Sequence, residues 1–275
     1  MKTLHKLHAQ LGEFARQFAD LADGYDRSLH HANELEQAID RYTAWITDRA
    51  NQSAWERLAE QEPGEFDQLV PAIRRDSARC VAMMEKYRAR KLLGGETAAA
   101  SYFADIEARI EEEFGRFRAA PSSKVLLVGS GSFPMTPLYI ARQTGAEVVG
   151  IDIDEEAIDL GRKVTAKLGE GLPIRLERAL LEELNFTMEA THVIFSSTVD
   201  VKYELLDRLH ALTNDQVVVA MRYGDGFKSL FNYPMEHVHD RKWRLTEQLQ
   251  RPDRVFDIAI YTKASANERE VETAR

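Results

Sequence analysis

Residues 125–134 read Val-Leu-Leu-Val-Gly-Ser-Gly-Ser-Phe-Pro, and this stretch decides the fold of the chain. An apolar run opens into Gly129 and Gly131, and a second apolar run, 148–151, ends at Asp152. This order is typical of a βαβ unit whose first turn approaches a ligand closely and whose second strand presents a carboxylate to ribose hydroxyls. The alternative is an ordinary α/β turn, in which the glycines serve close packing alone.

Pro134 stands where a dinucleotide-binding turn has its third glycine. Proline fixes its own φ angle and has no N–H to donate, so it suits the first turn of a helix but cannot help to hold a pyrophosphate. A nucleoside ligand without phosphates fits this turn better. We therefore expect S-adenosylmethionine (SAM), with its ribose on Asp152, its adenine beside the neighbouring loop and its amino-acid tail on the glycine turn.

Short apolar runs separated by helical segments begin at Lys124 and predict a parallel, doubly wound sheet. Two alternating runs at 243–249 and 255–261 follow, so the sheet should close with an antiparallel hairpin. The fold class is α/β, with a helical N-terminal domain followed by a Rossmann-like sheet of the SAM-dependent methyltransferase type. The five expected parallel strands are 124–129, 147–152, 173–177, 192–196 and 216–221.

The N-terminal part of the chain has helical periodicity only. Apolar residues recur at three- and four-residue steps over 4–21, 35–46, 66–84 and 106–117, and Gly94 with Gly95 should end the third of these helices. A segment around Pro121 leads into the first strand. We expect three parts, which are a helical domain at 1–120 that covers the acceptor side, a SAM-binding domain at 121–263 and a disordered tail at 264–275.

Composition narrows the class of protein. The chain has 275 residues, 44% of them hydrophobic, and a net charge of -9, which gives no general attraction to nucleic acid or to an anionic membrane. A single cysteine, Cys80, excludes an internal disulfide, and no apolar run approaches the roughly 20 residues of a membrane span. We expect a cytoplasmic protein with a small-molecule ligand and with neither nucleic-acid nor membrane partners.

The segment after the fourth expected strand reads Ser-Ser-Thr-Val-Asp at 196–200. Many SAM enzymes that methylate exocyclic amines have an Asp/Asn-Pro-Pro-Tyr/Phe motif there, so its absence argues against methylation of a base or of glutamine. The residues expected to contact SAM share the edge formed by the first turns of the sheet domain. They are Gly129, Ser130, Gly131, Phe133, Pro134, Asp152, Ile153, Leu180 and Ser196, although Leu180 could equally belong to the core.

The turn at 128–136, the Ile-Asp-Ile-Asp segment at 151–154 and the loop from Arg222 to Pro234 resemble those of nicotianamine synthases. The Ser132-Phe133 pair departs from the plant pattern and is similar to the shorter bacterial members that make opine-type metallophores such as staphylopine, pseudopaline and bacillopaline. The resemblance covers the sheet domain and, more loosely, the helical one. It implies transfer of the 2-aminobutanoyl (3-amino-3-carboxypropyl) group of SAM to the α-amino group of histidine, with the D-enantiomer favoured, and release of methylthioadenosine.

The resemblance also implies a glutamate and a tyrosine in the helical domain that deprotonate or orient the acceptor amine. Their best local matches are Glu85 and Tyr102. A solvated helix face is the alternative for Glu85, and ordinary core packing is the alternative for Tyr102. Arg222 and Tyr233 are candidates for binding the acceptor, although an exposed loop position would also explain Arg222.

Two histidine pairs suggest metal, but we expect none. The pairs at 30–31 and 237–239 have no convincing further ligands, and alkyl transfer from SAM needs no metal ion. Asp154 should cap the helix that follows it, and a cap is the alternative role for Asp152. The expected partners are the histidine acceptor, an opine-type dehydrogenase in the same pathway and a second copy of the chain in a homodimer.

Three other functions remain open from the sequence. The chain could be a nicotianamine-like synthase that uses SAM repeatedly, a small-molecule SAM-dependent N-methyltransferase, or a SAM-binding regulatory protein whose helical domain is an interaction surface. Formation of S-adenosylhomocysteine would indicate the methyltransferase, and repeated transfer without histidine would indicate nicotianamine-like synthesis. SAM binding without turnover would indicate the regulatory protein.

Overall fold

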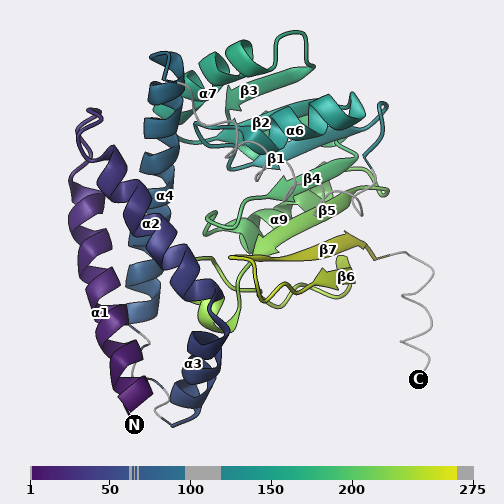
Figure 1. Cartoon of the computed structure of the whole chain (residues 1–275). Helices are drawn as coiled ribbons and strands as arrows, with labels where there is room; N and C mark the ends of the chain where they lie inside the picture. Colours follow the sequence, from purple (N-terminus) through teal and green to yellow (C-terminus); the bar gives the residue numbers. More distant parts are fainter. Residues whose placement is uncertain (1, 62–63, 65, 67, 97–118, 265–275) are drawn as a thin grey trace, which may run out of the picture.

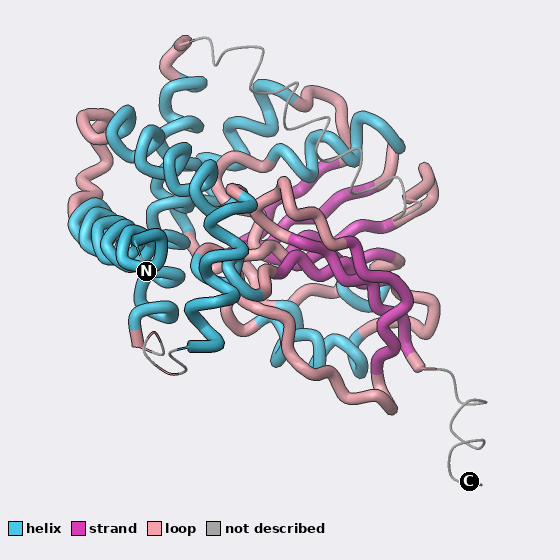
Figure 2. Tube along the Cα trace, turned by 60° about the horizontal axis from the view of Figure 1, so that its bottom comes forward, coloured by secondary structure: helices cyan, strands magenta, loops and turns pink. Residues whose placement is uncertain are grey.

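The computed structural model describes residues 2–61, 64, 66, 68–96 and 119–264. A layer of long helices stands beside a twisted sheet, and the view in Figure 2 shows these two parts again from a second direction. The fourth expected helix, with Tyr102 just before it, and the expected tail beyond Ala264 lie outside the described residues.

The sheet has seven strands in the order β3-β2-β1-β4-β5-β7-β6. The first five are parallel, whereas β7 runs antiparallel to both β5 and β6, so the predicted doubly wound sheet with a closing hairpin is confirmed. The strands are β1 Lys124–Val128, β2 Glu147–Asp152, β3 Ile174–Arg178, β4 His192–Phe195, β5 Val218–Tyr223, β6 Trp243–Leu249 and β7 Asp257–Lys263.

Both faces of the sheet are covered, which explains why its strands read as continuous apolar runs. Val125 and Leu127 of β1 pack in one cluster with Ile140 of α6 (Met135–Thr144). Leu126 packs on the opposite face with Leu206 of α9 (Lys202–Leu212). Helix α7 (Glu155–Leu168) connects β2 to β3. The connection from β3 to β4 contains the 3-10 turn η1 (Leu181–Glu183) and the short helix α8 (Phe186–Glu189).

The helical layer contains α1 (Lys2–Asp23), α2 (Ala32–Thr47), α3 (Arg49–Gln61) and α4 (Leu69–Leu93). As predicted, Gly94 and Gly95 end α4, where Gly95 has a φ of 87° that a glycine adopts easily. Helix α3 was not predicted, because its apolar stripe is short. Its buried apolar residues are Ala54, Trp55 and Leu58.

The helical layer shares its core with the segment that follows β5. Phe227, Leu230 and Phe231, in and just after the 3-10 turn η2 (Gly226–Leu230), pack among the aromatic side chains of α1 to α4. The hydroxyl of Tyr42 donates to the carbonyl of Leu230 at 2.9 Å. Val255 packs against the same cluster, and β7 begins at Asp257 and not at 255 as predicted. The helical layer thereby fixes the loop at the carboxyl end of β5.

Helices α4 and α7 lie side by side (Figure 1). Glu156 in the first turn of α7 accepts hydrogen bonds from Arg90 at 2.5 Å, from the Tyr25 hydroxyl at 2.9 Å and from Lys86 at 3.1 Å. Burial by itself would raise the pKa of Glu156, but these three donors outweigh it and lower the pKa to about 2. The helical layer is therefore joined to the sheet by charge as well as by apolar packing.

Among the described residues, no helix is long and apolar enough to cross a membrane.

Candidate active site

The candidate site lies between β1 and β4, where the order in which the strands follow one another across the sheet reverses. Strands β1 and β4 are neighbours, and the connections that leave them lead to opposite sides of the sheet, which is where ligands of such folds bind. Gly129 follows β1 and Ser196 follows β4, and the Ser196 hydroxyl donates to the carbonyl of Gly129 at 2.7 Å. Gly129 has a φ of 80°, and a Cβ atom there would come within 2.7 Å of Val199. The turn therefore requires glycine.

Asp152 ties the glycine turn to the end of β2. Its Oδ2 accepts the N–H of Gly131 at 2.9 Å and its Oδ1 accepts the N–H of Asp154 at 3.0 Å. Asp154, and not Asp152, caps α7 by accepting the N–H of Ala157 at 3.2 Å. The cap predicted at Asp154 is confirmed, and the alternative role of Asp152 as a helix cap is wrong. The carboxylate of Asp152 remains partly exposed and available to a ligand.

Glu85 projects from α4 onto the glycine turn. A Cβ atom at Gly131 would overlap Oε2 of Glu85, so this carboxylate occupies the space that the missing side chain leaves. The N–H of Ser132 donates to the same carboxylate. The alternative of a solvated helix face for Glu85 is therefore wrong, because packing between the helical layer and the sheet brings the side chain to the cofactor edge.

The surroundings of Glu85 raise the pKa of its carboxyl. Burial, and after it the nearby Asp152 carboxylate, raises the pKa of its carboxyl from 4.5 to about 7, against the opposing effect of the Ser132 N–H and the cations of Arg88 and Arg222. A carboxylate with a pKa near the working pH can both accept a proton and release it again.

Arg222 belongs to β5 and not to the loop after it. Its side chain is 9% exposed, so the interpretation as an exposed loop arginine is wrong. The guanidinium donates to the Thr136 hydroxyl at 3.1 Å and lies 5.2 Å from the centre of the Phe256 ring. It is held in a fixed direction at the carboxyl end of β5, close enough to Glu85 to influence its pKa.

Tyr233 follows η2, and its ring faces α4 of the helical layer. The guanidinium carbon of Arg74 in α4 is 5.4 Å from the centre of the Tyr233 ring, and Arg74 also donates to the carbonyl of Ser229 at 2.5 Å. The Tyr233 side chain is half-buried. Its ring therefore packs beside α4, while its backbone bonds to Ser197 and Gly224 after β4 and β5.

The remaining predicted residues divide into exposed and packed groups. Ile153 and Leu180 are 74% and 51% exposed, and they follow the neighbouring strands β2 and β3, as side chains that flank an adenine would. Phe133 instead lies buried in a cluster with Ala89 and Leu92 of α4, so its side chain packs between the two layers.

The turn itself has unused hydrogen-bonding capacity. The hydroxyls of Ser130 and Ser132 are buried, and neither has a hydrogen-bond partner within the described part of the chain. Buried hydroxyls are normally paired, so both point to a polar ligand. Together with the glycine turn, the partly exposed Asp152 and the exposed apolar pair, these hydroxyls fit SAM.

Sequence reasoning missed Ser132 and Thr136. Ser132 lies within the turn that decided the fold, so its hydroxyl could have been counted with that of Ser130. Thr136 carried no such signal, because its role depends on the approach of Arg222 from β5. Pro134 is buried immediately before α6, in agreement with the expected helix start.

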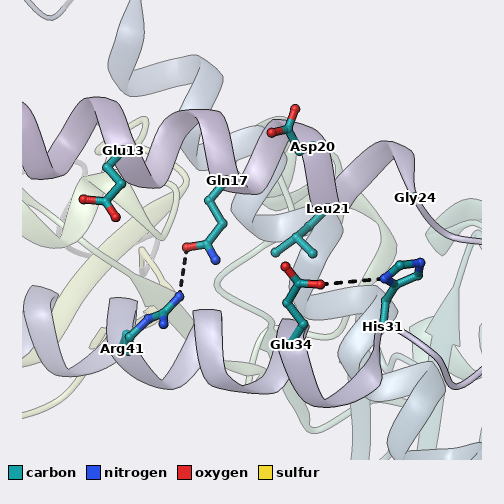
Figure 3. A pocket seen from close by; sticks show the side chains of 8 residues that line it. All are labelled: Glu13, Gln17, Asp20, Leu21, Gly24, His31, Glu34 and Arg41. Atoms are coloured by element: carbon teal, nitrogen blue, oxygen red, sulfur yellow. Dashed lines mark hydrogen bonds and ion pairs between the residues drawn. The ribbon is translucent and has the colours of Figure 1, made fainter.

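A separate groove of about 430 Å³ lies between α1 and α2 (Figure 3). Arg41 donates to Gln17 at 3.2 Å across it, and His31 pairs with Glu34 at 3.7 Å. None of the residues of the candidate site lines this groove. The glycine turn and Glu85 therefore form a site of their own.

No family model matches the chain. A curated protein of Pseudomonas aeruginosa, named L-histidine 2-aminobutanoyltransferase, is 28% identical over 233 residues, which are 84% of this chain and 86% of that protein. The chain is similar to L-histidine 2-aminobutanoyltransferases. A protein of the same name from Yersinia pestis is 27% identical over 237 residues and covers 86% of this chain and 88% of its own length.

Solved structures support the same resemblance at the level of the fold. A mutant of the nicotianamine synthase MtNAS superposes with a TM-score of 0.77 at 12% identity, covering 94% of this chain and 98% of that one. A complex of such a mutant with S-adenosylmethionine gives a TM-score of 0.73 at 14% identity, covering 92% and 98%. The helical layer and the sheet together thus have the nicotianamine synthase fold, as the glycine turn predicted.

Proposed function

We propose that this protein transfers the 2-aminobutanoyl group of SAM to the α-amino group of histidine and releases methylthioadenosine. The observation that carries the proposal is the contact of Glu85 with Gly131, which brings a near-neutral base from the helical layer to the glycine turn. The similarity to proteins named L-histidine 2-aminobutanoyltransferase supports both the transferred group and the acceptor.

SAM supplies a sulfonium that makes the γ-carbon of its methionine part electrophilic. The acceptor nitrogen forms a bond to this carbon while the carbon–sulfur bond breaks, its electron pair passes to the sulfur of methylthioadenosine, and the nitrogen loses one proton. In this scheme the chain must select the γ-carbon over the methyl carbon by positioning alone.

Glu85 is proposed to take the proton from the acceptor nitrogen. A neutral amine is needed for attack, and the raised pKa of this carboxyl improves the match between base and amine. Tyr102, which lies outside the described residues, remains the proposed second residue of this pair. Arg222 is proposed to pair with a carboxylate of the acceptor, with Tyr233 beside it.

We assign the binding of SAM to the glycine turn and to the residues at the carboxyl ends of β2 and β3. In the proposal, Gly129, Ser130 and Gly131 hold the amino-acid tail of SAM, and Asp152 binds its ribose. Ile153, Leu180 and Ser196 border the adenine and the sulfonium. Pro134 and Phe133 are proposed to act through the shape of the turn, since both are buried.

Both enantiomers of histidine are candidates for the acceptor. The resemblance noted from the sequence favours D-histidine, whereas the names of the relatives give L-histidine. We propose L-histidine on the strength of these relatives. The purified protein should be incubated with SAM and with L-histidine, D-histidine or no acceptor, and methylthioadenosine and the histidine adduct should be measured by mass spectrometry.

Each other function predicts a different product in that assay. Formation of S-adenosylhomocysteine would indicate a methyltransferase, and methylthioadenosine formed without histidine, together with products that contain several aminobutanoyl units, would indicate nicotianamine-like synthesis. SAM binding measured by calorimetry without any turnover would indicate a regulatory protein.

The cellular setting is also a proposal. We infer that the protein works in the cytoplasm as a homodimer and passes its product to an opine-type dehydrogenase of a metallophore pathway. A coupled assay with such a dehydrogenase and a 2-oxo acid should consume reduced nicotinamide cofactor only after SAM and histidine have reacted. Light scattering of the purified protein tests the homodimer.

A further inference from the structure

Lys202 is a buried lysine at the carboxyl edge of the sheet. It is the first residue of α9 and its side chain is 0% exposed. Taking an ammonium out of water costs several kcal/mol unless hydrogen bonds replace the lost water. Burial accordingly lowers the pKa of Lys202 to about 7, with the carboxylates of Glu236 and Asp225 acting to raise it and the Arg74 guanidinium to lower it.

The hydrogen bonds of Lys202 join three separate segments. Its Nζ donates to the carbonyls of Arg222 at 2.8 Å, Tyr233 at 2.9 Å and Ser197 at 3.4 Å. These carbonyls belong to the end of β5, to the loop after η2 and to the loop after β4. An ammonium has three N–H groups, so the three acceptors use its full donor capacity.

The same segments are also bonded to one another around the ammonium. The N–H of Tyr233 donates to the carbonyl of Ser197 at 3.2 Å, and the N–H of Gly224 donates to the carbonyl of Tyr233 at 3.1 Å. Lys202 therefore lies at the centre of a backbone network. On the opposite side, Tyr42 and Arg74 hold the same loop to the helical layer through the carbonyls of Leu230 and Ser229.

We propose that Lys202 is a positioning residue that fixes the backbones of Ser197, Arg222 and Tyr233, so that the side chains of Arg222 and Tyr233 meet the acceptor amino acid. This inference rests on the proposed function and goes beyond it, because Lys202 is fully buried and donates to three backbone carbonyls. A hydrophobic residue would fill the same space at lower desolvation cost, but it would leave the three carbonyls without their shared donor.

Lys202→Met tests the proposal, because methionine keeps a long unbranched side chain without the ammonium. Lys263→Met is the matched control. Lys263 is a partly buried lysine whose side chain is 7% exposed and donates to the carbonyl of Thr213 at 2.5 Å. It follows Thr262, which pairs with the first residue of β5, so it lies at the opposite end of that strand from Arg222.

Steady-state kinetics with both substrates should separate the two variants. In Lys202→Met the KM for histidine should rise by about tenfold or more, while the KM for SAM and its dissociation constant by calorimetry stay within about twofold. Lys263→Met should leave both KM values within about twofold, whatever its effect on thermal stability. Equal rises in both KM values, no rise in either, or the same change in Lys263→Met would overturn the proposal.

Hydrogen exchange of residues 224–233 gives a readout that does not depend on turnover. This segment should exchange faster in Lys202→Met than in Lys263→Met, with SAM affinity unchanged, and unchanged exchange would overturn the positioning role. If the unmodified protein transfers nothing to histidine, the proposed function fails, and the exchange measurement still decides whether Lys202 holds the loop. Should Lys202→Met not fold, Lys202→Gln, which retains a donor, takes its place with the same expectations.

Discussion

The Nζ of Lys86 lies 2.6 Å from Oδ2 of Asp154, so an ion pair joins the residue next to Glu85 to the short connection that follows Asp152. Lys86 also pairs with Glu156 at 3.1 Å. The base candidate and the ribose-binding candidate are therefore held in one framework, although they come from different layers of the molecule. The geometry of the site depends on this contact between α4 and the start of α7.

Glu156→Gln should weaken that framework. Removing the charge from a carboxylate that accepts from Arg90, Tyr25 and Lys86 should lower the free energy of unfolding by about 1–3 kcal/mol and should lower turnover as Glu85 loses its fixed position. Glu155→Gln is the matched control, since that side chain is 75% exposed and its pairing with Arg178 is at the surface. Denaturant unfolding and kcat measure the two effects, and equal behaviour of the two variants would contradict the prediction.

Glu85→Gln should remove the proton acceptor and keep the shape of the side chain. We expect kcat to fall by about 100-fold or more, because general bases typically contribute that much. SAM affinity should stay within about twofold. A loss of SAM binding measured by calorimetry would instead place Glu85 in the cofactor pocket and would contradict its role as base.

Activity and stability should respond to pH through Glu85 in opposite directions. With a pKa of about 7 the carboxyl ionises as pH rises through 7, so kcat should increase over that range and level off above it. The folded pKa is raised above the unfolded value, so Glu85 contributes stability that is fully present below about pH 4.5 and is lost as pH rises through 7. Glu85→Gln should lack this loss and be more stable above pH 7 by up to about 3 kcal/mol. Identical pH dependence of unfolding in both proteins would refute the raised pKa.

Gly131→Ala should displace Glu85. Gly131 has a φ of 64° and its missing Cβ is replaced by the Glu85 carboxylate, so alanine there adds a clash to the backbone strain. Gly171→Ala is the control, because Gly171 has a φ of 78° and no atom near its Cβ position. Both variants should lose about 1 kcal/mol of stability from strain, but only Gly131→Ala should lose most of its turnover. Equal activity of the two variants would contradict the contact.

Asp152→Asn should act on SAM and not on the acceptor. The amide oxygen can still accept the N–H of Gly131, although the Asp154 N–H loses its acceptor, and the amide weakens the charged hydrogen bonds to a ribose. The dissociation constant of SAM should therefore rise by about tenfold, with little change in the KM for histidine. An increase confined to the KM for histidine would move Asp152 to the acceptor side.

The regular elements of the sheet domain were predictable because each one depends on a local pattern. The run at 125–134 marks a strand, a turn and a helix start within ten residues, and the acid at the end of the next run marks the neighbouring strand. Several strand ends differ from the prediction by one or two residues. Val255, predicted to begin β7, instead packs against the helical core, and β7 begins at Asp257.

The side chains of the site were predictable only as candidates. Glu85 stands in a charged stretch of α4 and Arg222 near the end of an apolar run, and each fits an exposed position equally well by pattern. Lys202 and Thr136 carried no signal at all. Their roles arise from hydrogen bonds between residues that are far apart along the chain.

The sequence by itself determined the βαβ turn, the hairpin that closes the sheet and the preference for SAM over a dinucleotide, because glycine, proline and apolar periodicity act on the local backbone. Only the tertiary structure decided that Glu85 meets Gly131, that Arg222 is buried and that Lys202 joins three separate segments. Burial and electrostatic surroundings belong to the packed layers as a whole, and those surroundings raise the pKa of an ordinary helix glutamate to about 7.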